Sequence, residues 1–250
     1  MSLTTGRGPH SLDPAGRFVP DQRKPEAADG RPPLAAAYVE PFLRRVRGLR
    51  GDVSLIDSER VLLVHRPGEP PAYAFPERDV SPTLQALAEP AAPGYVRVPW
   101  DAVTAWYEEE EQVLAHPRNP YHRIDCLRAR RRLRVEVAGR VLVDTSDVIA
   151  LFETAKAPQL YVRRDAVRMD LLVPSQTSSY CPYKGQASYW SVQLGGDSVV
   201  DIAWSYDDPH PESAPIAGLL SFYAERTRSV QDVLTWFEVP TPAASERSHG

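Results

Sequence analysis

Short runs in which hydrophobic and polar residues alternate recur along this chain, and a two-residue period is typical of β-strands. Residues 53–56 and 58–64 form one pair of strand-like runs, and residues 133–137, which alternate strictly, form another pair with residues 138–143. Each pair has a tight central turn, so we expect each pair to form a β-hairpin. The pattern therefore predicts a mainly β protein with a minor α+β component.

The order of the runs repeats along the chain, which predicts an internal duplication. The segment 73–80 resembles the segment 161–167. Each half then closes on a strand led by glycine and on an aromatic and acidic segment, at residues 94–98 and 106–108 in the first half and at 218–222 and 236–238 in the second. We predict two small antiparallel-sheet domains, a degenerate first copy over residues 34–125 and a second copy over residues 126–240.

The two predicted copies differ in length at one place. Val80 and Gly94 stand close together in the first copy, whereas Val167 and Gly218 of the second copy are about 37 residues further apart. That additional segment contains the residues with the richest chemistry in the chain. We therefore expect the functional site in the second copy and a structural role for the first.

Two strand-like runs in this segment, residues 188–194 and 198–206, flank a Gly-Gly-Asp turn. The alternation predicts a three-residue loop that pairs Trp190 with Ile202, because this register places the large apolar side chains of both runs on one face. A two-residue loop would break that segregation. Trp190 and Trp204 then share a face, which is either part of the core or the wall of an aromatic pocket.

The segment Tyr180–Trp190 combines a thiol, an amine and four large aromatic side chains. The chain has 26 arginines and only three lysines, so Lys184 suggests a need for a compact, titratable amine. We treat Cys181 and Lys184 as candidate catalytic residues, the thiol as nucleophile or acid–base group and the amine as the group that holds or polarises the substrate. The candidate walls of the pocket are aromatic: Tyr180, Tyr183, Trp190, Trp204 and Tyr206.

Simpler interpretations of these two residues stay open. Cys181 is also compatible with a small buried hydrophobic side chain. Lys184 is compatible with an anion contact, with a Schiff-base amine or with a solvated turn residue. His210 follows the second strand and could serve Cys181 as a base, although nothing in the sequence links them.

The bulk composition excludes several classes of function. The 250 residues carry a formal net charge of −4, so the chain as a whole does not attract a phosphate backbone and we expect no nucleic-acid partner. Five arginines lie within residues 128–134 but lead directly into a strand without interleaved aromatic residues. This favours a solvated strand edge over an anion contact.

The two cysteines, Cys126 and Cys181, form neither a disulfide framework nor a Cys-x-x-Cys motif. His116 and His122 flank a proline-containing linker at a spacing that suits no metal pair, so we expect no metal and no cofactor. No apolar run is long enough for a secretory leader or a membrane span. We expect a cytoplasmic protein without a membrane partner, with disordered segments at residues 1–33 and 241–250.

Five motifs in the second half resemble the domain-of-unknown-function family numbered 427, and the linker and first copy look like its two-copy bacterial members. The resemblance implies a β-tent fold, in which small antiparallel sheets meet along one edge. That fold is shared with the thalidomide-binding domain of cereblon, whose ligand sits among tryptophans, and with zinc-stapled proteins whose Cys-x-x-Cys motifs this chain lacks. The motifs are residues 167–172, 180–185, 187–192, 203–206 and 214–218.

Three functions are consistent with these observations. The first is an enzyme that acts on a small anionic or carbonyl-bearing molecule in the pocket of Cys181, Lys184 and the aromatic residues. The second is a non-catalytic module that binds a small ligand in an aromatic cage. The third is a structural protein.

The family has also been associated with nucleotidyl transfer, but Gly195–Ser198 form a hairpin turn and no Asp-x-Asp pair follows to hold two magnesium ions. The sequence does not indicate an oligomeric state.

Overall fold

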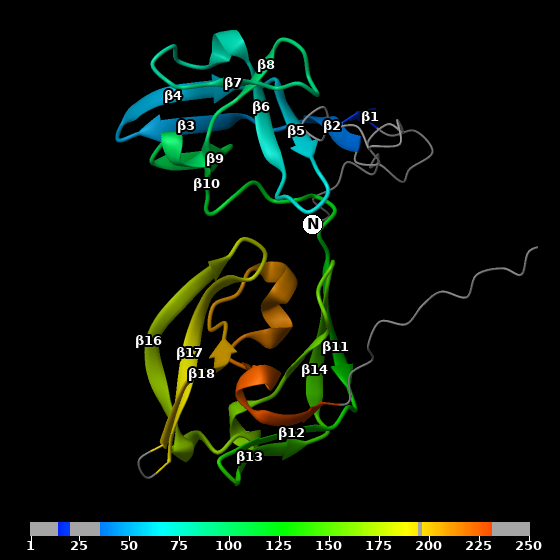
Figure 1. Ribbon diagram of the computed structural model, residues 1–250, viewed down its shortest axis with the longest axis vertical. Coiled ribbons are helices and arrows are strands. Elements are labelled where there is room, and N and C mark those ends of the chain that lie inside the picture. Colours follow the sequence, from blue (N-terminus) through cyan, green and yellow to red (C-terminus); the bar gives the residue numbers. More distant parts are fainter. Residues whose placement is uncertain (1–14, 21–35, 195–196, 232–250) are drawn as a thin grey trace, which may run out of the picture. The chain divides into compact units, whose positions relative to one another are not determined.

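The computed structural model describes residues 15–20, 36–194 and 197–231 (Figure 1). Over these residues the expectation of a mainly β protein built from small antiparallel sheets is confirmed, with 55% strand and 11% helix. The helical residues lie in short 3-10 turns. The predicted disordered tail at 241–250 lies outside the described residues, and so does most of the predicted leader.

The described part of the leader differs from the expected disorder. Residues Arg17–Pro20 form strand β1, which pairs with β2 (Ala36–Phe42). Tyr38 explains the order, because its hydroxyl accepts a hydrogen bond from the Gly16 N–H at 3.0 Å and its ring packs against Phe18.

The chain divides into two compact units that interleave in the sequence. The first unit comprises residues 1–123, 178–187 and 208–213, and the second comprises residues 124–177, 188–207 and 214–250. Residues 178–187 form the tip of a long hairpin, and residues 208–213 follow the next strand along the chain. Both segments are thus part of the first unit.

Two sheets form the first unit. One has the strand order β1-β2-β5-β6-β8-β7 and the other β10-β9-β3-β4. Their hydrophobic residues form the core of this unit. The strands are β3 (Val46–Arg50), β4 (Val53–Ser58), β5 (Val61–His65), β6 (Ala72–Pro76), β7 (Leu87–Ala88), β8 (Tyr95–Arg97), β9 (Ala105–Glu108) and β10 (Glu111–Val113), with the 3-10 turns η1 (Glu77–Asp79) and η2 (Trp100–Ala102).

Three further sheets, with the orders β11-β14-β15, β13-β12-β20 and β16-β17-β18-β19, follow in the chain. The second unit has its own hydrophobic core. The strands are β11 (Ile124–Ala129), β12 (Leu133–Val137), β13 (Arg140–Thr145), β14 (Val148–Glu153), β15 (Gln159–Tyr161), β16 (Leu172–Cys181), β17 (Gly185–Leu194), β18 (Asp197–Ser205), β19 (Leu220–Phe222) and β20 (Arg228–Gln231). The 3-10 turns are η3 (Arg164–Ala166), η4 (Met169–Leu171), η5 (Pro211–Ile216) and η6 (Ala224–Arg226).

Elements recur in the same order and at a constant offset. Strands β3, β4, β5 and β6 and the turn η1 begin at residues 46, 53, 61, 72 and 77, and β12, β13, β14, β15 and η3 begin at 133, 140, 148, 159 and 164. Each position is about 87 residues after its counterpart. The pairings also correspond, because β3 lies between β4 and β9 as β12 lies between β13 and β20.

One of the two predicted hairpins is correct and the other is wrong in its pairing. Strand β12 pairs with β13 as expected. Strand β4, however, pairs with β3, and β5 pairs with β2 and β6. Gly51 provides the reason, because its φ of +58° suits the two-residue turn between β3 and β4. The segment 236–238 lies outside the described residues, and β20 takes the position on β12 that β9 takes on β3.

The predicted register of β17 and β18 is also wrong. Trp190 pairs with Ala203 rather than with Ile202, and Leu194 pairs with Asp197 across a two-residue loop. A bulge in β18 causes the shift. Its residue Asp201 has a φ of +53°, and the Asp201 N–H donates to the Ser191 hydroxyl at 3.0 Å.

The bulge changes which side chains share a face. Tyr189 pairs directly with Trp204, whereas Trp190 pairs with Ala203. Because side chains alternate between the faces of a strand, Trp190 and Trp204 lie on opposite faces of this sheet. The bulge also leaves the side chain of Val200 exposed.

Candidate functional site

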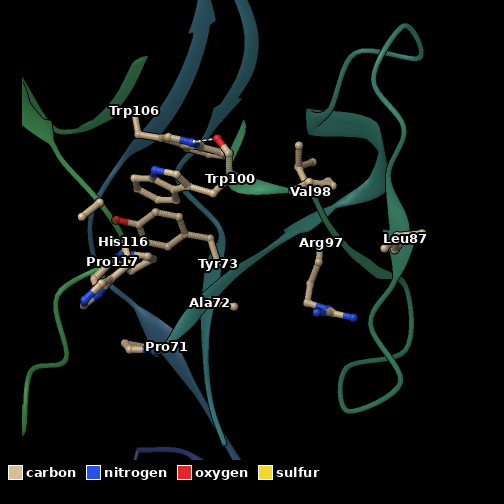
Figure 2. Close-up of a pocket in the computed structure, with 12 residues that line it drawn as sticks. Pro71, Ala72, Tyr73, Leu87, Arg97, Val98, Trp100, Trp106, His116 and Pro117 are labelled. Carbon is tan, nitrogen blue, oxygen red and sulfur yellow. Dashed lines mark hydrogen bonds between the residues drawn. The ribbon is translucent and has the colours of Figure 1, made fainter. Parts of the chain in front are cut away.

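A cavity of about 350 Å³ lies in the first unit (Figure 2). Its lining is mostly apolar and aromatic, and its residues come from two sheets and from the segment that follows β10. The lining residues are Pro71, Ala72, Tyr73, Leu87, Arg97, Val98, Pro99, Trp100, Trp106, Ala115, His116 and Pro117. An apolar cavity of this size with a few polar groups is typical of a small-molecule site.

Two stacked tryptophans form one wall. Trp106 faces inward from β9, where buried and half-buried residues alternate, and only 3% of its surface is exposed. Its indole N–H donates to the Trp100 carbonyl oxygen at 2.8 Å. The two rings are nearly parallel, with centroids 5.0 Å apart. Trp100 is half-buried, so it presents ring surface to the cavity.

Tyr73, on β6, continues this wall below Trp100 (Figure 2). Its hydroxyl donates a hydrogen bond to the buried carboxylate of Glu108, and Arg44 forms an ion pair with the other oxygen of that carboxylate. Burial, and then the charge of Glu108, raises the pKa of Tyr73 well above its usual range. Tyr73 is therefore a neutral phenol whose ring is fixed from behind.

Arg97 lies on the other side of the cavity, on β8 (Figure 2). Its Nε lies 2.8 Å from Oε2 of Glu89, but the N–H is not directed along the line of a hydrogen bond. Glu89 is fully buried and also pairs with Arg66 at 2.5 Å. The carboxylate of Glu89 thus holds two arginines, one of which lines the cavity.

The wall formed by His116 and Pro117 is supported by the tip of the β16–β17 hairpin. The Tyr183 ring lies flat against His122 and is tilted toward His116, with centroids 3.7 and 6.1 Å away. The Tyr183 hydroxyl accepts a hydrogen bond from the Asn119 N–H at 2.8 Å. Tyr183, predicted as a ligand-binding residue, therefore contacts the linker residues that line or follow the cavity.

A buried carboxylate fixes the linker at a second point. Oε2 of Glu40 accepts a hydrogen bond from the Tyr121 hydroxyl at 2.5 Å, and Oε1 lies 2.8 Å from Nε2 of His65. Burial, followed by the hydrogen bond to Glu40, raises the pKa of Tyr121. Tyr121 is a neutral donor, and the segment 116–122 is held by its contacts with β2, β5 and the hairpin tip.

The structure places four of the predicted site residues in the first unit, namely Tyr180, Cys181, Tyr183 and Lys184. Cys181 is half-buried, whereas only 8% of the Lys184 surface is exposed. The Lys184 N–H donates to the Cys181 carbonyl at 3.2 Å and closes a turn around Pro182. None of the four lines the cavity.

His210 lies beside this turn. Its backbone N–H donates to the Lys184 carbonyl at 3.1 Å. Its Nε2 lies 3.2 Å from the Tyr180 hydroxyl and 3.4 Å from Nη2 of Arg118. Burial, and then the charge of Arg118, lowers the pKa of His210, so its imidazole is neutral at neutral pH while Nε2 lies within hydrogen-bonding distance of both groups.

The other three predicted residues, Trp190, Trp204 and Tyr206, belong to the second unit. The Trp190 indole N–H donates to the Ser205 hydroxyl at 3.3 Å. The Trp204 indole N–H donates to the Tyr161 hydroxyl at 3.0 Å. Tyr206 is buried. Trp190 and Trp204 thus donate to different hydroxyl groups, both within the second unit.

Sequence reasoning did not identify the residues that line the cavity. Tyr73 and Arg97 belong to runs that were interpreted as ordinary strands, and they meet only because β6 and β8 are neighbours in one sheet. A usable signal was present in Trp100 and Trp106, two of the five tryptophans within seven positions. It was assigned to a first copy that was expected to be structural.

Within the described ranges, no group of three or more His, Cys, Asp and Glu side chains is arranged to hold a metal ion. Within the same ranges, no helix is both long and apolar enough to cross a membrane.

Comparison with known proteins identifies the second half of the chain and leaves the first half unassigned. No curated protein matches the chain. A family model described as Domain of unknown function (DUF427) matches residues 125–244. The cavity, which is lined by residues between 71 and 117, lies outside that match. Residues 125–244, just under half of the chain, thus match the DUF427 family.

Proposed function

We propose that the protein binds a small molecule in the cavity of the first unit. The observation that carries this proposal is the cavity itself, with about 350 Å³ of space beside the rings of Tyr73, Trp100 and Trp106. Aromatic rings contribute a large contact area for a planar or apolar ligand at a small cost in conformational entropy. The site differs from the pocket of Cys181 and Lys184 that the sequence led us to expect.

The contacts behind the rings support a binding role. The Trp106 indole bonds to the Trp100 backbone, and the Tyr73 hydroxyl bonds to Glu108, so both rings are positioned before any ligand arrives. Preorganised walls lower the entropic cost of binding. Trp106 and Tyr73 also belong to the core of this unit, whereas the half-buried Trp100 is the ring best placed to contact a ligand.

A screen of small planar aromatic compounds tests the proposal. Binding is measured by ligand-observed NMR for the wild type, for Trp100→Ala and for Tyr107→Ala. Tyr107 is the matched control because it is a half-buried ring on β9 that does not line the cavity. We expect compounds to bind the wild type and Tyr107→Ala and to lose affinity for Trp100→Ala. Equal binding to all three proteins, or no binding to the wild type, would refute the proposal.

A second candidate function is acid–base chemistry at the hairpin tip, as expected for an enzyme that uses Cys181 and Lys184. It is favoured by His210, a neutral imidazole within 3.2 Å of the Tyr180 hydroxyl. Labelling of Cys181 in a Cys126→Ser background tests this function. A catalytic thiol should react faster than a buried one, and His210→Gln should slow the reaction. Slow labelling that is unchanged by His210→Gln would argue against catalysis.

Two wider expectations from the sequence are part of the proposal. The constant offset of about 87 residues between corresponding elements supports an internal duplication, in which the second copy gained strands β16 to β18. The paucity of cysteine supports a cytoplasmic, reducing environment. Localisation of a tagged chain by cell fractionation tests the second expectation.

A further inference from the structure

We infer that the ligand of this cavity is a planar aromatic molecule that carries one carboxylate, and that Arg97 recognises the carboxylate. This inference rests on the proposed function, because it specifies the ligand of the same site. It follows from the charges of the lining residues, from the support of Arg97 and from the arrangement of the two walls.

The charges of the lining favour an anion over a cation. The lining contains Arg97 and no aspartate or glutamate. An aromatic cage can bind an ammonium group through its ring faces, but a cation in this cavity would also be repelled by Arg97. Glu108, whose carboxylate lies behind Tyr73, does not compensate, because Arg44 and the Tyr73 hydroxyl already occupy its oxygens.

The guanidinium of Arg97 is held by its inner edge. Its Nε lies beside the buried Glu89, and neither Nη1 nor Nη2 donates a hydrogen bond to any of the described residues. Those two nitrogens are the outer fork of the guanidinium, which matches the two oxygens of a carboxylate. Glu89 is itself fixed by Arg66 and by the Ala91 N–H at 2.9 Å, so the support is rigid.

The shape of the cavity limits the size and form of the rest of the ligand. Tyr73 and Trp100 form one side, and Arg97 and Leu87 form the other (Figure 2). A flat ring that packs against Trp100 and Tyr73 can therefore extend a short arm toward Arg97. The available volume of about 350 Å³ suits a ligand of one or two fused rings.

Three probes with one ring system test the inference: indole-3-acetate, which is anionic, indole-3-acetamide, which is neutral, and tryptamine, which is cationic. Dissociation constants are measured by isothermal titration with the wild-type protein. We expect the carboxylate to bind roughly tenfold tighter than the amide, in line with a hydrogen bond to a charged group, and tryptamine to bind weakest. Equal or tighter binding of the amide or the amine would overturn the inference and leave the proposed function intact.

Two variants assign the preference to Arg97. Arg97→Gln should weaken the binding of indole-3-acetate about tenfold and leave the binding of indole-3-acetamide unchanged, because the substitution removes the charge-assisted bond alone. Arg97→Lys, which keeps the charge near Glu89, covers the case in which the glutamine variant unfolds and should give an intermediate loss. An unchanged carboxylate preference in a folded Arg97 variant would overturn the assignment. If none of the three probes binds the wild type, the proposed function fails together with the inference.

Discussion

The imidazole of His122 stacks on the phenol ring of Tyr183, with ring centroids 3.7 Å apart and an angle of 15° between their planes. Tyr183 belongs to the Cys-Pro-Tyr-Lys turn in the DUF427 part of the chain, and His122 belongs to the linker that follows the cavity wall. The stack therefore ties the most distinctive motif of the sequence to the segment that carries His116. Tyr183 acts on this segment as a positioning residue, since it does not itself line the cavity.

Two substitutions of Tyr183 should separate the contribution of its hydroxyl to stability from the contribution of its ring. Tyr183→Phe keeps the stack but removes the acceptor of the Asn119 N–H, and we expect a loss of about 1 kcal/mol in the free energy of unfolding. Tyr183→Ala also removes the ring and should cost about 3 kcal/mol. Urea denaturation measures both values. Equal losses for the two variants would show that the stack contributes nothing to stability.

Tyr73→Phe should destabilise the protein by about 1–3 kcal/mol, because the buried carboxylate of Glu108 loses one of its two partners. Tyr107→Phe, on β9 in the other sheet of this unit, is the matched control. Its half-buried ring packs under the guanidinium of Arg47, and its change should stay within about 0.5 kcal/mol. Chemical denaturation of both variants decides the point. A Tyr73→Phe protein as stable as the control would mean that Arg44 alone satisfies Glu108.

The sequence predicted the local features of this fold better than the long-range ones. Alternation along residues 133–143 identified the hairpin of β12 and β13, because strand period and turn are local properties. The partner of β4 was missed, because residues on both of its sides are strand-like and only the turn at Gly51 distinguishes them. The register of β17 and β18 was missed because a bulge at Asp201 allows a two-residue loop without burying polar groups.

The candidate site was harder to predict than the fold. Tyr73, Arg97 and Trp106 come from three strands, β6, β8 and β9. They form a cavity only after the sheet order is known, and no local pattern gives that order. The segment 180–190 was more conspicuous because its reactive groups are adjacent in the sequence. Its Tyr183 proved to contact the linker, which a spacing argument cannot show.

Gly185→Ala should destabilise the hairpin tip more than Gly139→Ala destabilises the β12–β13 turn. Both glycines have positive φ, +97° and +74°, so both variants incur backbone strain of about 1 kcal/mol or more. A Cβ at Gly185 would also approach the Asp208 carbonyl oxygen to 3.3 Å, whereas at Gly139 it would meet nothing within 4 Å. Thermal melts of the two variants make the comparison. A larger effect at Gly139 would contradict the close packing of the 208–213 loop on the turn.

The stability of the protein should fall as the pH drops below about 6.5, and His210 should account for part of that loss. Burial, and then the charge of Arg118, lowers the pKa of His210 in the folded state, while Asp208 and Glu212 oppose the shift. The unfolded chain then binds the proton more readily than the folded chain. The contribution of His210 is complete above its unfolded pKa and is lost as the pH falls toward its folded value.

Urea midpoints at pH 7.5 and pH 5.5, measured for the wild type and for His210→Gln, test this linkage. Glutamine keeps a polar side chain beside Tyr180 and Arg118 but does not titrate in this range. The variant should lose less stability than the wild type between the two pH values. All other titratable groups are the same in the two proteins, so their contributions cancel in the comparison. An equal loss in the two proteins would mean that His210 binds its proton equally well in the folded and unfolded states. The neutral imidazole would then no longer support acid–base chemistry at the hairpin tip.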